Sequence, residues 1–201
     1  FNNLLLEFAR LHRFLMRFLR ELVTPPFEFK EFIRQCYEIG WKSFPLISLT
    51  GFIVGFVFTK QSRPSLEEFG ATSWLPAMIS IAIVRALAPL VTALIASGKV
   101  GSQIGAELSS MNVTEQIDAM EVSGTNPHKF LIATRILATT LMIPILTFYV
   151  AGIGLFGGYL SIISKDQLSI LSFFTQVFDK IGFVDVFAMV IRSVVFGFTI
   201  G

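Results

Sequence analysis

Two arginines stand inside long apolar runs of this 201-residue sequence. Arg85 lies near the middle of the run from Pro76 to Ser97, and Arg192 lies in the run from Ile181 to Gly201. An ionised side chain in a hydrocarbon layer costs about 2.5 to more than 10 kcal/mol, so it usually faces a cavity or a charged partner. A guanidinium binds a phosphate through two parallel hydrogen bonds. We therefore predict that both arginines border a cavity for an anionic lipid headgroup.

A carboxylate is the alternative partner for these arginines. Asp185 shares a helical face with Arg192, which follows two helical turns later in the same run. Two turns is a long reach for an ion pair. A headgroup site and internal ion pairing therefore both stay open at this point.

A second group of charged residues lies between two apolar runs, in the polar, glycine-rich stretch from Gly98 to Lys129. Glu115, Asp118 and Glu121 follow one another at three-residue steps, and on a helix they cover an arc of about 120° at about 100° per residue. The opposite side of that helix carries apolar residues: Val113, Ile117 and Met120. No basic residue of the helix balances the three carboxylates. This acidic face favours docking on another subunit, with a solvated helix resting on its own membrane domain as the alternative.

The stretch is predicted to form two helical pieces. The first places three apolar residues on one side: Ile104, Leu108 and Met111. Asn112 is expected to cap the second piece with Glu115 as its capping-box partner, and Gly124 is expected to end it. The glycines of the stretch match neither common phosphate-binding motif, so we predict no nucleotide site here.

The composition is that of a membrane protein. Hydrophobic residues make up 53% of the chain and charged residues only 15%, whereas a soluble domain has about 45–50% and about 25%. Mean hydropathy is +0.70. The net charge of +2 leaves no basic surplus for binding nucleic acid. One cysteine and two histidines exclude an internal disulfide and a His/Cys metal cluster. Neither histidine lies in an apolar run, so no nucleophile and base pair supports an intramembrane enzyme.

Four apolar runs are predicted to cross a membrane: residues 44–59, 76–97, 136–163 and 181–201. A basic amphipathic segment over residues 1–22 and a second one over 27–40 are predicted to lie in the interface. A soluble helix packed on its own protein is the alternative for the first. These assignments divide the chain into interfacial helices (1–43) and a transmembrane domain (44–201).

Lysine and arginine are most frequent in the N-terminal segment, which places that segment in the cytoplasm. Alternation then puts the stretch 98–129 in the cytoplasm and the loops 60–73 and 164–180 on the other side. Residues 170–178 are predicted to form a short interfacial helix. Two pairs of glycines, Gly51 with Gly55 and Gly154 with Gly158, have the four-residue spacing that lets transmembrane helices pack closely.

The acidic stretch resembles the signature of the MlaE/YrbE-type permeases, the membrane subunits of lipid-transporting ABC systems. The motif residues are Gly98-Lys99-Val100-Gly101-Ser102, Ala106-Glu107-Leu108, Met111, Val113 to Glu121, and Asn126-Pro127. Similar segments outside the motif are Gln35 to Gly40, Pro127 to Arg135, and Ile191 to Phe196. The resemblance covers essentially the whole chain.

The resemblance implies an all-α integral membrane protein with an interfacial N-terminal helix and about five spans, located in a bacterial inner membrane. It implies a homodimeric permease bound to a cytoplasmic ABC ATPase and to a periplasmic MCE-domain lipid-binding protein. The complex would move phospholipid, with ATP and Mg²⁺ in the partner ATPase and no cofactor in this chain. The chain would be a transport subunit rather than an enzyme. The last family span is absent, and we expect both natural ends to lie beyond the sequence given.

The resemblance also assigns roles to residues. It implies a coupling helix from Glu107 to Glu121 seated in the ATPase, with these contact residues: Glu107, Met111, Glu115, Ile117, Asp118, Met120 and Glu121. Arg85 matches a family arginine, and Arg85 and Arg192 are the expected substrate-binding residues. The family often has Arg-Glu-Leu-x-Pro here, whereas this chain has Ala86 after Arg85, so we expect Arg85 to be less well neutralised. The alternative function is a non-transporting membrane scaffold that recruits a cytoplasmic partner through the acidic helix.

Overall fold

The computed structural model describes residues 29–124, 128–163 and 169–201. The described residues are almost entirely helical and contain no strand. The predicted amphipathic segment over residues 1–22 lies outside the described residues. Four described helical segments are long and apolar enough to cross a membrane: Phe29–Glu68, Thr72–Val113, Leu131–Ile163 and Phe183–Ile200. Each overlaps one of the four predicted runs, so the predicted all-α integral membrane fold is confirmed.

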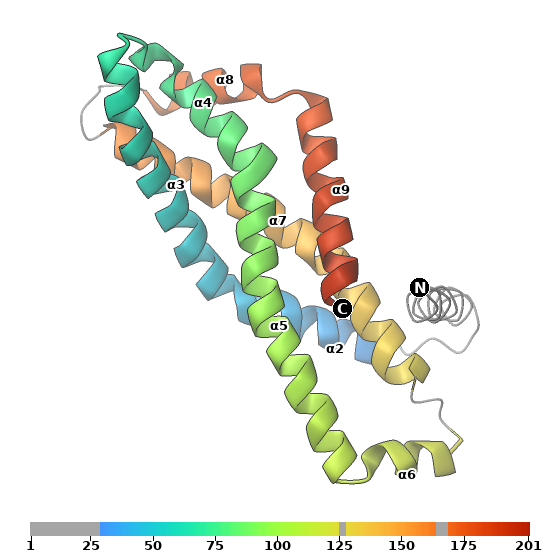
Figure 1. The fold of residues 1–201 in the computed structure, drawn as a ribbon. Helices are drawn as coiled ribbons and strands as arrows, with labels where there is room; N and C mark the ends of the chain where they lie inside the picture. Colours follow the sequence, from blue (N-terminus) through green and yellow to red (C-terminus); the bar gives the residue numbers. More distant parts are fainter. Residues whose placement is uncertain (1–28, 125–127, 164–168) are drawn as a thin grey trace, which may run out of the picture.

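The helices follow one another along the chain as in Figure 1. Their bounds are α2 Phe29–Gly40, α3 Phe44–Glu68, α4 Leu75–Ala82, α5 Ala88–Val113, α6 Gln116–Val122, α7 Thr134–Ile163, α8 Ile170–Lys180 and α9 Phe183–Ile200. Short tighter or wider turns join some of them: the 3₁₀ turns η1 Trp41–Ser43 and η2 Thr72–Trp74, and the π turns η3 Ile83–Leu87 and η4 His128–Ala133. Through η3, helices α4 and α5 form one nearly continuous rod.

Two helices extend beyond the predicted runs. α3 continues to Glu68, so the predicted loop 60–73 is mostly helix. α5 continues to Val113, so the first predicted piece of the acidic stretch is an extension of the second span. A helix ends where its backbone loses hydrogen-bond partners rather than where its side chains become polar. The end of an apolar run therefore marks the expected edge of the hydrocarbon layer and not the end of the helix.

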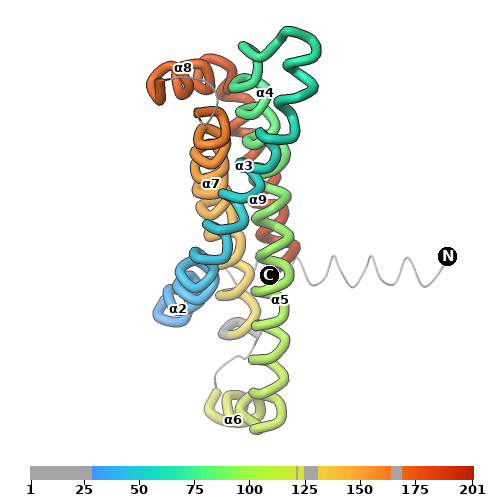
Figure 2. Tube along the Cα trace, turned by 90° about the vertical axis from the view of Figure 1, so that its left-hand side faces the viewer, coloured from blue at the N-terminus to red at the C-terminus, as the bar shows by residue number. Residues whose placement is uncertain are grey.

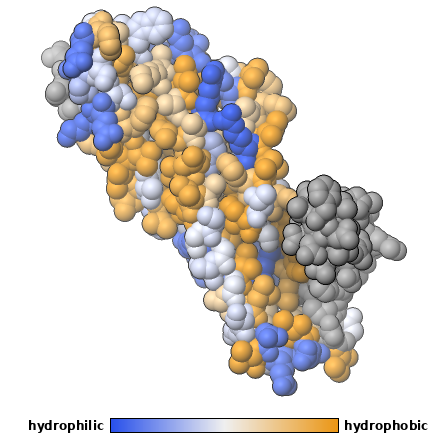
Figure 3. Space-filling view, in the orientation of Figure 1, coloured by the Kyte–Doolittle hydropathy of each residue, from blue (hydrophilic) through white to orange (hydrophobic). Residues whose placement is uncertain are grey.

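The two ends of the bundle differ in shape. α5 runs past the other helices and carries α6 at its tip, while α8 lies across the opposite end (Figures 1 and 2). Apolar residues cover much of the visible middle of the bundle in Figure 3, and hydrophilic residues gather at the α6 tip. α8 buries Phe173 and Val177 and exposes Leu171 and Phe178, as expected for the predicted interfacial helix.

α7 is the central helix and packs against α2, α3, α5 and α9. α3 and α7 approach most closely where their glycines meet. A Cβ atom added at Gly55 would overlap the Gly154 carbonyl oxygen and lie 2.7 Å from the Gly154 Cα atom. A Cβ atom at Gly158 would lie 2.9 Å from Thr59 Oγ1. The predicted close packing by these glycines is confirmed, and it occurs between α3 and α7 of the same chain.

Gly55→Ala is expected to destabilise the protein by about 1–3 kcal/mol, because the new methyl group meets backbone that has no free rotation to escape. Gly152→Ala on α7, the helix against which Gly55 packs, is the matched control, since nothing lies within 4 Å of a Cβ atom at Gly152. Thermal unfolding of the purified protein in detergent, followed by tryptophan fluorescence, measures the difference. Equal melting temperatures for the two variants would contradict the close approach of α3 and α7.

Candidate functional sites

Arg85 forms an ion pair with Asp185. Its Nε atom lies 2.6 Å from Asp185 Oδ1. Arg85 belongs to the π turn η3, and Asp185 lies in the first turn of α9, where it also accepts a hydrogen bond of 3.0 Å from the Gly182 backbone N–H. This N-terminal cap fixes the carboxylate at a helix end that favours negative charge. Arg85 was expected to be less well neutralised for want of a glutamate at position 86, but α9 supplies a carboxylate from Asp185 instead.

Arg192 contacts the same turn from α9. Its Nη1 atom donates a hydrogen bond to the Arg85 carbonyl oxygen. Pro89 has no backbone N–H, so the Arg85 carbonyl cannot accept the usual α-helical hydrogen bond from the residue four positions later. Arg85 instead lies in a π turn, and its carbonyl oxygen accepts the hydrogen bond from Arg192 on α9. Such π turns are frequent at functional sites. Asp185 therefore pairs with Arg85 and not, as considered from sequence, with Arg192.

We call Arg85, Asp185 and Arg192 the arginine cluster. It carries two positive charges and one negative charge. Arg85 leaves 53% of its side chain exposed while Asp185 leaves 13%, so the exposed part of the ion pair is the guanidinium. The structure thus brings together the two arginines predicted as binding residues, and their guanidinium groups keep N–H donors beyond those in the two contacts described.

The predicted coupling residues lie at the junction of α5 and α6. The proposed Asn112 cap is wrong: α5 continues through Asn112, and Thr114 closes α5 with its backbone N–H and its hydroxyl, both bonded to the Ser110 carbonyl. Glu115 then turns the chain with a φ of 54°, an unusual conformation for a residue other than glycine. α6 begins only at Gln116.

The exposure of this junction matches the predicted two-sided pattern only in part, because Val113, predicted on the apolar side, is 82% exposed. Glu115 and Asp118 are exposed, while Met111, Ile117 and Met120 are half-buried. α6 contains no basic residue, and neither Glu115 nor Asp118 forms an ion pair with another described residue. The structure does not describe the side chain of Glu121. The junction therefore presents unbalanced carboxylates beside an apolar strip.

Glu107 differs from these residues because its carboxylate binds inside the chain. Its Oε2 atom lies 2.7 Å from Arg135 Nη2 on α7, and its Oε1 atom lies 3.0 Å from Arg34 Nη2 on α2. Arg135 is only 2% exposed, and none of its three guanidinium nitrogens forms a hydrogen bond with the described residues, so its contact with Glu107 is an ion pair without hydrogen-bond geometry. Glu107 is therefore the carboxylate that balances a buried guanidinium. Its assignment as an ATPase contact stays a prediction.

A row of polar contacts fastens α2 to the α6-bearing half of α5. The contacts are Arg34 Nη2 to Glu107 Oε1 (3.0 Å), Gln103 Nε2 to Glu38 Oε2 (3.1 Å), and Lys99 Nζ to the Lys42 carbonyl oxygen. Lys99, Gln103 and Glu107 are four positions apart on α5, and Arg34 and Glu38 are four positions apart on α2, so they share one face of each helix. Lys42 belongs to the turn η1 that follows α2. We call this set the α2–α5 contact row. A displacement of α5 at this level would therefore act directly on α2.

Sequence reasoning missed Arg34, Glu38 and Arg135 as members of these contacts. The four-residue spacing of Arg34 and Glu38 on an amphipathic helix was visible, but their partners lie more than sixty positions away. Arg135 stands just before an apolar run, a position that usually indicates a solvated residue at a membrane boundary. Its burial results from α2 and α5 covering that end of α7.

The fold and these sites define an integral membrane protein whose apolar helices pack closely and carry a charged cluster. The family model described as Permease MlaE matches residues 32–201. The chain belongs to the MlaE permease family.

Several relatives support this assignment. A probable ABC transporter permease protein of Rickettsia typhi is 33% identical over 179 residues, which cover 89% of this chain and 69% of the relative. A protein of the same description from Rickettsia prowazekii is 34% identical over 179 residues, which again cover 89% of this chain and 69% of the relative. One from Synechocystis sp. is 35% identical over 165 residues, covering 82% of this chain and 63% of the relative. The predicted family is confirmed. The prediction that the chain is a membrane-embedded ABC transporter permease is confirmed with it.

Proposed function

We propose that this chain is the permease subunit of an ABC-type transporter that moves phospholipid between a bacterial inner membrane and a periplasmic MCE-domain protein. Two copies of the chain would form the permease. ATP and Mg²⁺ would be bound and used by a separate cytoplasmic ATPase, which docks on the α5–α6 junction, and this chain would hydrolyse no ATP. The names of the relatives support the ABC permease class. The phospholipid is implied by the family resemblance and supported by the chemistry of the site.

The observation that carries the lipid assignment is the arginine cluster with its surroundings. The half-exposed Arg85 guanidinium lies in a cluster with Arg192. Val195 and Phe196 follow Arg192 by three and four positions, so they share its face of α9, and both are exposed. A phosphate offers two acceptors to such a guanidinium, and acyl chains fit the apolar surface next to it. A soluble anion would gain nothing from that apolar neighbour. An amphipathic phosphate ester is therefore the ligand class that uses both surfaces.

The test is photo-crosslinking of a phospholipid with a photoreactive acyl chain to the assembled transporter in proteoliposomes. Arg85→Ala is expected to lower labelling of α4 and α5 about tenfold, because a hydrogen bond to a charged group contributes about 1.5–3 kcal/mol. Lys60→Ala, which removes an exposed cation from α3, is the control and should label like the unmodified protein. Size-exclusion chromatography confirms that both variants assemble. Unchanged labelling of Arg85→Ala would restrict Arg85 to a structural role.

A further inference from the structure

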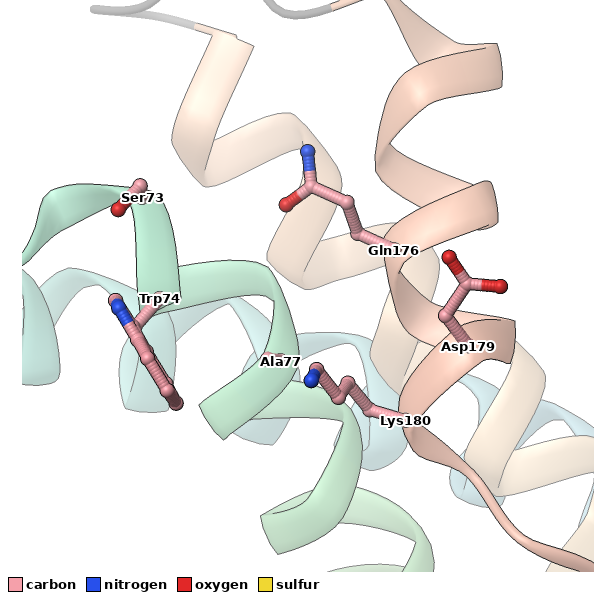
Figure 4. A pocket seen from close by; sticks show the side chains of 6 residues that line it. All are labelled: Ser73, Trp74, Ala77, Gln176, Asp179 and Lys180. Atoms are coloured by element: carbon pink, nitrogen blue, oxygen red, sulfur yellow. The ribbon is translucent and has the colours of Figure 1, made fainter.

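A pocket lies at the end of the bundle opposite α6, and none of its lining residues belongs to the arginine cluster. It has a volume of about 210 Å³ and lies between α8 and the start of α4. Figure 4 shows its lining side chains, which are Ser73, Trp74, Ala77, Gln176, Asp179 and Lys180. At about 30 Å³ per water molecule, it holds roughly seven waters. This space is large enough for the polar headgroup of a lipid.

The pocket presents both signs of charge. Lys180 Nζ lies 5.9 Å from the centroid of the Trp74 ring, and Asp179 forms no ion pair with another described residue. Lys180, Ser73 and Gln176 supply hydrogen-bond donors for an anion. The carboxylate of Asp179 attracts a cation. A ligand that carries a phosphate and an ammonium a few atoms apart would match both halves.

The surroundings of the pocket indicate that such a ligand would come from a membrane. Trp74 is 64% exposed and Phe178 is 70% exposed, and tryptophan and lysine are typical of the membrane–water boundary. α8 exposes the apolar side chains of Leu171 and Phe178 along the same end of the bundle. Acyl chains that leave the pocket would contact the exposed indole of Trp74, which lines it. A soluble phosphate compound has no acyl chain to make this contact.

We propose that this pocket binds the zwitterionic, phosphate-plus-ammonium headgroup of a membrane lipid. The site is additional to the arginine cluster and goes beyond the proposed transport function. It depends on the chain lying in a membrane and not on ATP-driven transport, so the two proposals fail separately.

The test follows the emission of Trp74 in the transporter purified in detergent, in a Trp41→Phe background that leaves Trp74 as the remaining tryptophan of this chain. A short-chain phosphatidylethanolamine is the probe, and a saturable shift of the emission is expected. Lys180→Ala is expected to raise its Kd at least tenfold. Asp179→Asn should weaken phosphatidylethanolamine severalfold while leaving short-chain phosphatidylglycerol unaffected, because only the former carries an ammonium. Thr175→Ala, on the exposed side of α8 and outside the pocket, is the control.

Two further arms separate the possible outcomes. Free phosphoethanolamine is expected to bind much more weakly than the short-chain lipid, and equal affinity would overturn the assignment to a lipid. Arg85→Ala should leave the Trp74 response unchanged, whatever its effect on crosslinking at the arginine cluster. An absent or unsaturable response, or an unchanged Kd for Lys180→Ala, would overturn the headgroup site even if transport is confirmed.

Discussion

Replacing Glu107 by glutamine is expected to lower the free energy of unfolding by about 3 kcal/mol. Arg135 is 2% exposed, and Glu107 is the carboxylate that lies within an ion-pair distance of it. Removing one partner of a buried pair leaves an uncompensated charge, which costs about 3–5 kcal/mol. The glutamine side chain keeps a carbonyl dipole near Arg135, so we expect the lower end of that range. At about 2–4 °C per kcal/mol, the melting temperature of the purified protein should fall by roughly 6–12 °C.

Two variants show whether the buried pair is the cause. Arg34→Ala removes the other partner of Glu107, but Arg34 is half exposed, and exposed pairs contribute about 0–1 kcal/mol. Combining Glu107→Gln with Arg135→Met removes the buried charge itself, so the double variant should regain most of the lost stability. If Arg34→Ala costs as much as Glu107→Gln, or the double variant is no more stable than Glu107→Gln, the buried pair is not what holds α5 on α7.

The membrane spans could be predicted from sequence because their cause is local. A run of about 20 apolar residues is long enough to cross the hydrocarbon layer as a helix whatever the rest of the chain does. The glycine pairs in two of these runs likewise indicated close packing, and Gly55 meets Gly154 in the structure. Helix ends were less predictable, since α5 continues through Gly98, Gly101 and Gly105 despite their low helix propensity.

The charge partners could not be predicted, because pairing depends on tertiary contacts. Asp185 is one hundred positions from Arg85 and on a different helix, and no periodicity links the two. The capping box at Asn112 failed for a related reason. The sequence pattern fits the motif, but α5 extends over Asn112 and the chain turns at Glu115 with a positive φ, a conformation that sequence rules reserve mainly for glycine, asparagine and aspartate.

Reversing the charge of the acidic junction is expected to abolish lipid-stimulated ATP hydrolysis in the reconstituted transporter. The change is the combination Glu115→Lys, Asp118→Lys and Glu121→Lys. The α6 tip projects from the bundle in both views (Figures 1 and 2), and Glu115 and Asp118 are exposed. Like charges placed against each other at an interface cost several kcal/mol, so an ATPase surface that accepts these carboxylates would reject three lysines. The stimulated rate should fall more than tenfold, to that of the ATPase alone.

Thermal stability separates this effect from misfolding. Glu115 and Asp118 make no ion pair with the described residues, so the triple variant should melt close to the unmodified protein. Glu107→Gln, by contrast, is expected to lower the melting temperature of the isolated chain, before any partner is added. Glu68→Lys, which changes an exposed acid on α3 at the opposite end of the bundle, controls for a general effect of added positive charge.

The comparison of these variants also tests how a signal would leave the junction. α6 is continuous in sequence with α5, and α5 contacts α2 through the α2–α5 contact row and joins the arginine cluster through η3. A displacement of α6 would therefore be carried through α5 to α2, and through α5 and η3 to Arg85. If the triple variant keeps its lipid-stimulated turnover, the ATPase does not use the acidic junction. Retained turnover together with loss of another bound cytoplasmic protein would instead favour a recruiting role for α6.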